Sequence, residues 1–281
     1  VRNPLYNKNI SYSYLGNLGS PYRSNIVEPI QEAKNQTLIN QPFNAYLHKA
    51  EDQVFFNTKK PFTCIDYHST NGNKDKFEER IRVIHTQNVT PGFNFGFQYE
   101  NLSDKGQYTH KNSKITNLSL FSSLLYGNYS LHCDININSV GPFEKNGGIV
   151  NDEYARDTSL RTEFLKVNLS SAMGELKNQN VFINQELGFG SYLPDTLRDS
   201  LRAPVFSLGH NLSFDNNSRL YTDRQTPNLG FYQSFFYDST QTRDTSHFRS
   251  FSNSFYFKIH EHPESPFKFS GTAGFTLDFV K

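Results

Sequence analysis

An eleven-residue segment with strict alternation of polar and apolar side chains constrains the fold most. In residues 128–138 (NYSLHCDININ), every odd position is apolar or aromatic and every even position is polar. Successive side chains of a β-strand point to opposite faces, so the pattern predicts a strand with one apolar and one polar face. About 9–11 tilted strand residues cross a bilayer's hydrocarbon, whereas strands of soluble domains usually have about 5–6. The segment is therefore long enough to span a membrane.

The same alternation recurs along the chain. Regular examples are residues 93–100, 206–215, 251–259 and 267–279. In segments 206–215 and 251–259, only His210 and Asn253 interrupt the apolar positions. Less regular strand candidates are Val54–Thr58, Phe62–Ser69, Phe77–Thr86, Ile115–Tyr126, Thr162–Ser171 and Val181–Tyr192. The chain is therefore expected to contain about ten or eleven strands.

Composition agrees with strands that surround a polar interior. The mean hydropathy is −0.64, yet aromatic residues make up 15% of the chain. In a membrane barrel only alternate residues face lipid, while the interior and the loops are polar, so the mean hydropathy stays low. No stretch of about 18 apolar residues is present, which excludes a transmembrane helix. A net charge of +1 with scattered Lys and Arg excludes nucleic acid as an expected partner.

Few residues have the spacing of a catalytic or metal site. Cys64 and Cys133 are too few for a disulfide framework and are interpreted as small packing residues. His132 and Asp134 share one strand face without an evident third ligand, and His260 and His262 flank Glu261 next to a predicted turn. No serine, histidine and acidic residue are spaced so as to single out a catalytic trio. We therefore expect no cofactor, no metal and no enzymatic activity.

The fold class expected from these patterns is all-β, an antiparallel up-and-down transmembrane β-barrel. In hydrocarbon, an unpaired backbone amide or carbonyl costs several kcal/mol, so the sheet must close or find another edge. Hairpin turns are predicted at Asn71–Asn73, Asp104–Gly106, Tyr126–Asn128 and Asp215–Ser218. Residues 1–50 are turn-rich and without sustained period, so they are expected to form an extended periplasmic or lumenal lead-in, with the barrel in residues 51–281.

The alternation assigns each strand residue to lumen or lipid. The expected lumen-lining residues are Asn94, Gln98, Glu100, Asn128, Ser130, His132, Asp134, Asn136, Lys268, Thr272, Thr276 and Asp278. The expected lipid-facing residues are Phe93, Phe95, Phe97, Tyr99, Tyr129, Leu131, Cys133, Ile135, Ile137, Phe267, Phe269, Phe275, Leu277 and Phe279. Mixed charges in the lining predict a weakly selective aqueous path. Arginine at position 135 should then be costly, whereas arginine at position 136 should be tolerated in a wet lumen.

Four motifs in the first 150 residues carry a family resemblance. They are Tyr14–Pro21, Val54–Thr63, His85–Gly96 and Glu144–Ile149. With these motifs the chain resembles the putative porin family of Bacteroidota. The remainder of the sequence is similar only in its general character. The resemblance implies a barrel in the outer membrane of a Gram-negative bacterium, exported with a signal peptide that this chain lacks. Family members are generally longer, so the chain is expected to be an N-terminal portion of a larger barrel.

Two functions from different classes remain open at this point. The first is a porin-like barrel that permits passive diffusion of small polar solutes. The alternative is a structural or accessory barrel subunit of a larger outer-membrane assembly for secretion, insertion or nutrient uptake. The expected partners are outer-membrane lipid and, for the alternative, other outer-membrane proteins. A soluble β-sandwich or β-solenoid is disfavoured, because its strands would be shorter and its inner face richer in aliphatic residues.

Overall fold

The computed structural model describes residues 5, 11–14, 16–26, 40–70, 77–106, 108–144, 159, 161, 165–190, 204–224, 242–262, 266 and 268–281. Two short 3₁₀ helices, η2 (Gln41–Tyr46) and η3 (Ala50–Asp52), precede the main sheet. The strands are β1 (Tyr12–Tyr14), β2 (Tyr22–Ser24), β3 (Phe62–Ser69), β4 (Glu78–Thr90), β5 (Phe93–Asp104), β6 (Ser113–Tyr126), β7 (Tyr129–Glu144), β8 (Met173–Phe189), β9 (Phe206–Asp223), β10 (Thr242–Ile259) and β11 (Gly271–Val280). The described part of the chain is thus mostly β-strand.

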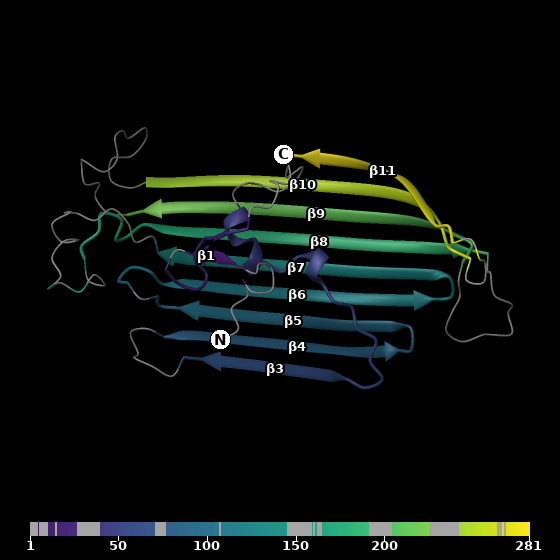
Figure 1. The fold of residues 1–281 in the computed structure, drawn as a ribbon, viewed down its shortest axis with the longest axis horizontal. Coiled ribbons are helices and arrows are strands. Elements are labelled where there is room, and N and C mark those ends of the chain that lie inside the picture. The colour runs from purple at the N-terminus through teal and green to yellow at the C-terminus, as the bar shows by residue number, and fades with distance from the viewer. Residues whose placement is uncertain are drawn as a thin grey trace.

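Nine of these strands form one sheet in which each strand pairs with the next one in the chain. The order runs from β3 to β11 without a crossover, and every pairing is antiparallel (Figure 1). This confirms the expected all-β, antiparallel up-and-down fold. The sheet is not closed, because β3 and β11 form its two edges and do not pair with each other.

The central strands are much longer than those of an ordinary soluble domain. β9 and β10 each contain 18 residues and β8 contains 17. At about 3.3 Å per residue, such strands reach about 55–60 Å, roughly twice the thickness of a bilayer's hydrocarbon core. Within the described residues, no helix combines the length and apolar character needed to cross a membrane.

Several expected elements are confirmed, and three are wrong. Phe62–Ser69 is β3, and the turns at Asp104–Gly106 and Tyr126–Asn128 lie where they were predicted. No strand forms at Val54–Thr58 or in the described part of Thr162–Ser171. The predicted turn Asp215–Ser218 lies in the middle of β9 and pairs with strands on both sides. The predicted turn Asn71–Asn73 falls outside the described residues.

The misread turn has a physical explanation. Asn217 is on the buried side of β9 and binds Asn178, while Asn216 on the opposite side is bonded by Arg249. Both faces of β9 are polar at Asn216 and Asn217, because the apolar positions that alternate along the first half of the strand end at Phe214. Two consecutive asparagines therefore look like a turn in sequence although they continue a strand.

The described residues of the N-terminal segment pack on one face of the main sheet, which we call the covered face (Figure 1). Phe43, Leu47 and Leu18 join a buried cluster with Ile115 and Val140 of the sheet. Burial raises the pKa of the Tyr46 phenol in the same cluster well above its ordinary value. The main apolar core therefore lies between the N-terminal segment and β5–β8, and the segment is not a free tail.

A glycine on β9 permits a close aromatic contact across the sheet. A Cβ atom at Gly209 would lie 1.9 Å from the ring of Tyr256, its cross-strand partner on β10. The Tyr256 hydroxyl passes over the glycine and donates to Glu186 on β8. Tyr256 can bridge two strands only because residue 209 has no side chain.

Gly209→Ala should therefore destabilise the sheet. Moving the Tyr256 ring should lower the free energy of unfolding by about 1–3 kcal/mol, the usual cost of overpacking. A urea titration of detergent-solubilised protein measures the difference. The control is Gly271→Ala, because a Cβ at that position meets its nearest neighbour at an ordinary 3.5 Å. Equal midpoints for the two variants would contradict the close contact.

Candidate functional site

The main sheet sorts its side chains in the opposite way from a soluble protein. On β7, the polar side chains of Asp134 and Asn136 are 0% and 1% exposed, whereas those of Ile135 and Ile137 are 40% and 46% exposed. Soluble proteins bury aliphatic side chains and expose amides. We call the face that carries Ile135 the apolar face. The arrangement suits a sheet whose apolar face meets a non-aqueous medium.

Asparagines form a continuous row across the covered face. Asn117, Asn138, Asn178 and Asn217 are cross-strand partners on β6, β7, β8 and β9. The Asn138 amide donates to Asn178 at 2.7 Å, and the Asn178 amide donates to Asn217 at 2.7 Å. Each of these residues is at most 7% exposed. Buried amides that satisfy one another in this way rigidify a polar interior.

A second polar row lies two residues away along the strands. It contains Ser119, Asn136, Asn180 and Asp215, again as cross-strand partners. The Asn136 amide donates to Asn180 at 2.8 Å, and the Ser119 hydroxyl donates to Asn136. Together the two rows form a flat surface of amide and hydroxyl groups over β6–β9.

The N-terminal segment binds these rows through its backbone at His48. The backbone N–H of His48 donates to the Asn138 side chain at 2.9 Å, and the Asn138 amide returns a bond to the His48 carbonyl at 2.8 Å. The Asn180 amide donates to the same carbonyl at 3.3 Å. The Asn117 amide donates to the Tyr46 carbonyl at 2.8 Å. Sheet asparagines thus provide hydrogen bonds to the last carbonyl of η2 and to the irregular backbone at His48.

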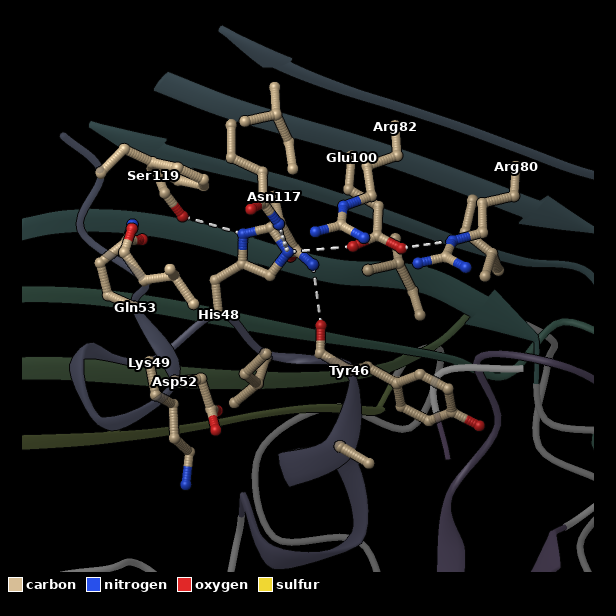
Figure 2. Close-up of a pocket in the computed structure, with 18 residues that line it drawn as sticks. Tyr46, His48, Lys49, Asp52, Gln53, Arg80, Arg82, Glu100, Asn117 and Ser119 are labelled. Atoms are coloured by element: carbon tan, nitrogen blue, oxygen red, sulfur yellow. Dashed lines mark hydrogen bonds and ion pairs between the residues drawn. The ribbon is translucent and has the colours of Figure 1, made fainter. Parts of the chain in front are cut away.

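The His48 ring extends this contact toward β4 and β5 (Figure 2). Its Nδ1 lies 2.9 Å from the Ser119 hydroxyl, and its Nε2 lies 2.9 Å from a Glu100 carboxylate oxygen. The other Glu100 oxygen accepts a 2.6 Å bond from Arg80 Nε. Because the Ser119 hydroxyl donates to Asn136, it is left to accept from His48 Nδ1, while His48 Nε2 faces both Glu100 and the Gln98 amide. His48 and Arg80 thus share one carboxylate.

Two serine–histidine–glutamate groups are present, and neither has the geometry of a catalytic triad. In the first, the Ser119 hydrogen goes to Asn136, so His48 does not accept it. In the second, the Ser207 hydroxyl and Glu186 both contact the Nε2 atom of His260, at 2.6 and 3.4 Å. A triad needs the base to accept from serine on one nitrogen and to be oriented through the other.

The residues considered as metal ligands are engaged in other contacts. The His132 ring packs edge-on against Phe55, with ring centroids 4.8 Å apart. Asp134 accepts a bond from Asn136 on the same strand. Among the residues that the structure describes, no group of three or more His, Cys, Asp or Glu side chains could hold a metal ion.

Two cavities lie between the N-terminal segment and the covered face. One, of about 440 Å³, lies over β4–β6 and is lined by His48, Arg80, Arg82 and Glu100, among others (Figure 2). The other, of about 400 Å³, lies over β8 and β9 and includes Asn180. Leu47 and Lys49 line both cavities. The segment around His48 therefore divides the space above the sheet into two compartments.

The exposed apolar band on the other face runs obliquely to the hydrogen-bonded rows. One row is apolar on β4–β7 and polar on β8–β10; its members are Val83, Tyr99, Leu118, Ile137, Gln179, Asn216 and Arg249. The apolar stretches of β8–β10 therefore lie nearer the Tyr129 end of β7 than the apolar stretch of β4 does.

The polar residues within the apolar band satisfy one another. The Tyr129 hydroxyl donates to Gln185, and the Gln185 amide lies 2.9 Å from His210 Nδ1. The other His210 nitrogen lies 2.6 Å from Asn253, and its ring stacks on Phe255 at 4.5 Å. His210 and Asn253, which break the alternation in sequence, therefore form one hydrogen-bonded chain across β7–β10.

The expected lumen-lining residues reach different places. Asn94 and Glu100 are buried on the covered face like Asp134 and Asn136, whereas Asn128 is exposed in the β6–β7 turn. Others on the covered face are Gln98, Ser130, His132, Thr272, Thr276 and Asp278. Lys268 precedes β11 and pairs with Glu261 at 3.2 Å. The structure brings together Gln98 and Glu100 at the His48 ring.

The expected lipid-facing residues on β5, β7 and β11 share the apolar face. They are Phe93, Phe95, Phe97, Tyr99, Tyr129, Leu131, Cys133, Ile135, Ile137, Phe275, Leu277 and Phe279. Phe269 precedes β11 and is 59% exposed, and Phe267 lies outside the described residues. Which medium each face meets stays a prediction.

The expectation that position 136 tolerates arginine is wrong for this structure. Asn136 is 1% exposed and bonds Ser119, Asp134 and Asn180. An arginine there would displace the hydrogen-bonded rows and the segment above them. The interior is packed at this level because residues 40–58 occupy it, which the alternation of β7 alone could not reveal.

Sequence reasoning also missed residues that hold the segment or line the cavity above β4–β6. His48, Arg80 and Arg82 were not singled out, and neither were Asn117 and Asn178. The available signal was the pair of asparagines two residues apart on two neighbouring strands, at 136 and 138 and at 178 and 180. Such pairs predict two parallel rows of side-chain amides on one face of the sheet. Buried amides need hydrogen-bond partners, so a polar segment is expected to cover these rows.

The chain was compared with protein families, curated proteins and solved structures. The family model described as "Putative porin" matches residues 1–279. No curated protein and no solved structure matches the chain.

His48→Ala should loosen the N-terminal segment. The variant loses the ring contacts to Ser119 and Glu100, each worth about 1 kcal/mol, so amide hydrogen exchange in residues 40–54 should accelerate by about tenfold or more. Exchange mass spectrometry in detergent measures it. His68→Ala, at an exposed position of β3, is the matched control and should leave the segment unchanged. Unaltered exchange in both variants would show that the His48 ring does not hold the segment.

Proposed function

We propose, because the chain belongs to the putative porin family, that it is an outer-membrane β-barrel protein of a Gram-negative bacterium and permits passive diffusion of small polar solutes. Family membership supports the porin-like barrel and the outer membrane, while passive diffusion is the further step. The absence of a triad geometry in either serine–histidine pair is consistent with a non-enzymatic role.

The observation that carries the proposal is the exposed apolar face. One row across β5–β11 illustrates it, since its members are Phe97, Leu120, Ile135, Val181, Phe214, Phe251 and Phe279. Monomeric soluble proteins rarely expose a contiguous apolar patch of more than a few hundred Å². A lipid boundary accounts for such a face, and the amide rows behind it supply a polar interior.

The path would run beside the N-terminal segment. The two cavities on either side of Leu47 and Lys49 provide open space above the covered face. Their linings contain Arg80, Arg82 and Lys49 as well as Glu100 and Asp215, so neither sign of charge dominates. Such a lining supports weak overall selectivity.

Planar bilayers test the diffusion proposal directly. Purified protein should produce steps of conductance that rise in proportion to salt concentration, as an aqueous path does. Liposomes with the protein should also swell in small neutral sugars faster than empty ones. Protein that inserts but neither conducts nor passes sugars would overturn passive diffusion.

A second function is favoured by the segment that covers the sheet. Because residues 40–58 fill much of the covered face, the barrel could serve as a structural or accessory subunit of an outer-membrane assembly. The double variant Asn138→Ala, Asn180→Ala separates the two functions, since it removes three bonds that hold His48. A large rise in conductance over a silent parent chain would favour the accessory function, with the segment as a plug. Similar conductance in the double variant and in the parent chain would favour passive diffusion through a path that is already open.

Two adjacent substitutions on β11 should distinguish a lipid boundary from water. Leu277 is 51% exposed on the apolar face, and its neighbour Thr276 is exposed on the other. Leu277→Arg should lower the free energy of unfolding in lipid vesicles by about 2–4 kcal/mol if it lies near the midplane, whereas Thr276→Arg should change it by less than about 1 kcal/mol. Urea titrations in vesicles measure both. In a water-soluble sheet the two exposed positions would tolerate arginine equally, and that result would refute the lipid boundary.

A further inference from the structure

The larger cavity contains an unusual concentration of charged side chains. It lies between residues 45–56 and strands β4–β6 and has a volume of about 440 Å³. Figure 2 shows Arg80, Arg82 and Glu100 next to one another, close to His48. Lys49 also lines the cavity. The cavity is of the size that small-molecule sites usually have.

All but one of these charges have a partner. Glu100 lies between Arg80 and His48, at 2.6 and 2.9 Å. Lys49 pairs at 3.6 Å with Glu51. Asp52, the other carboxylate of the lining, is exposed and has a partner of its own. These contacts account for the two carboxylates and two of the three permanently charged cations.

Arg82 is the exception. Within the part of the chain that the structure describes, it forms no hydrogen bond or ion pair, and its Nε atom is buried without a partner. A guanidinium stays charged at all ordinary pH values and offers five donors in a planar fork. Arg82 as a whole is half-buried, and its Nε is the atom that is both buried and without an acceptor. An anion bound in the cavity would supply that acceptor.

An unpaired acceptor lines the same cavity. The Oδ1 atom of Asn117 is buried without a hydrogen-bond partner, while its amide donates to Tyr46. Buried polar groups are nearly always bonded to protein, water or ligand. A molecule that satisfies both Arg82 and Asn117 must combine an anionic group with a donor such as a hydroxyl.

We propose that Arg82 binds the carboxylate of a small hydroxylated acid, such as a sugar acid, and that Asn117 accepts a hydrogen bond from one of its hydroxyls. A carboxylate matches the guanidinium fork with two parallel bonds. The inference rests on the proposed function and deepens it, because it names the class of solute that the path favours. The binding has to be weak, since a solute that crosses must also leave.

Isothermal titration in detergent tests the site with two sugars that differ in charge, D-glucuronate and D-glucose. Glucuronate should bind at least tenfold more tightly than glucose, and its affinity should fall as NaCl is raised from about 50 to about 500 mM. Arg82→Gln should reduce glucuronate binding at least tenfold. Arg249→Gln is the matched control, because Arg249 lies on the apolar face and bonds Asn216. This control should bind as the parent chain does.

Each outcome bears on the assignment. Equal affinities for the two sugars, or unchanged binding in Arg82→Gln, would overturn it. Inorganic phosphate that binds as tightly as glucuronate would overturn the hydroxylated acid in favour of a simple anion. If Arg82→Gln fails to fold, Arg82→Lys keeps the charge without the fork and should bind glucuronate less tightly than the parent chain; unchanged affinity would overturn the proposed geometry.

Binding and conductance are measured separately, so the two proposals can fail separately. Protein that binds glucuronate in detergent without conducting in bilayers would contradict diffusion and leave the Arg82 site in place. Protein that conducts without a preference for glucuronate over glucose would contradict the Arg82 site alone.

Discussion

The register between neighbouring strands is the constraint on which the rest of the structure depends. Strand side chains alternate with a period of two, so a slip of one residue would exchange the two faces of a strand. Over β5–β9 the pairing holds Ile135 in line with Leu120 and Val181, and Asn136 in line with Ser119 and Asn180. The exposed apolar face and the buried amide rows are therefore two results of one alignment.

The amide rows in turn position the N-terminal segment. Asparagine offers both a donor and an acceptor, so a row can bond along itself and still bind a backbone above it. Asn138 does both, since it donates to Asn178 and to the His48 carbonyl and accepts from the His48 amide. Apolar side chains in the same positions would bury the segment without fixing its register. The position of His48, and with it the shape of both cavities, follows from these bonds.

Much of the sheet could be predicted from the sequence, and little of the site could. Alternation in residues 128–138 identifies β7, because the signal is local and a strand's faces follow from its own residues. The turn predicted at Asp215–Ser218 failed because local composition does not reveal where a long strand leaves the apolar band. The contacts of His48 could not be foreseen, since they join residues 50 to 132 positions apart. Arg82 was overlooked because its significance is that its buried Nε atom has no hydrogen-bond partner. Only the three-dimensional contacts around it reveal this.

The docked segment also constrains the order in which the molecule assembles. Asn40 bonds Asn217 on β9 across 177 residues of chain, and the same segment contacts β5 through Glu100. Loops of that length close slowly, because their closure entropy must be overcome before the contact forms. The segment is synthesised before the strands that it contacts, yet it can complete its contacts only after β9 has joined the sheet. Until the segment docks, the side-chain amides that bind it, such as those of Asn138 and Asn180, have only water or one another as partners.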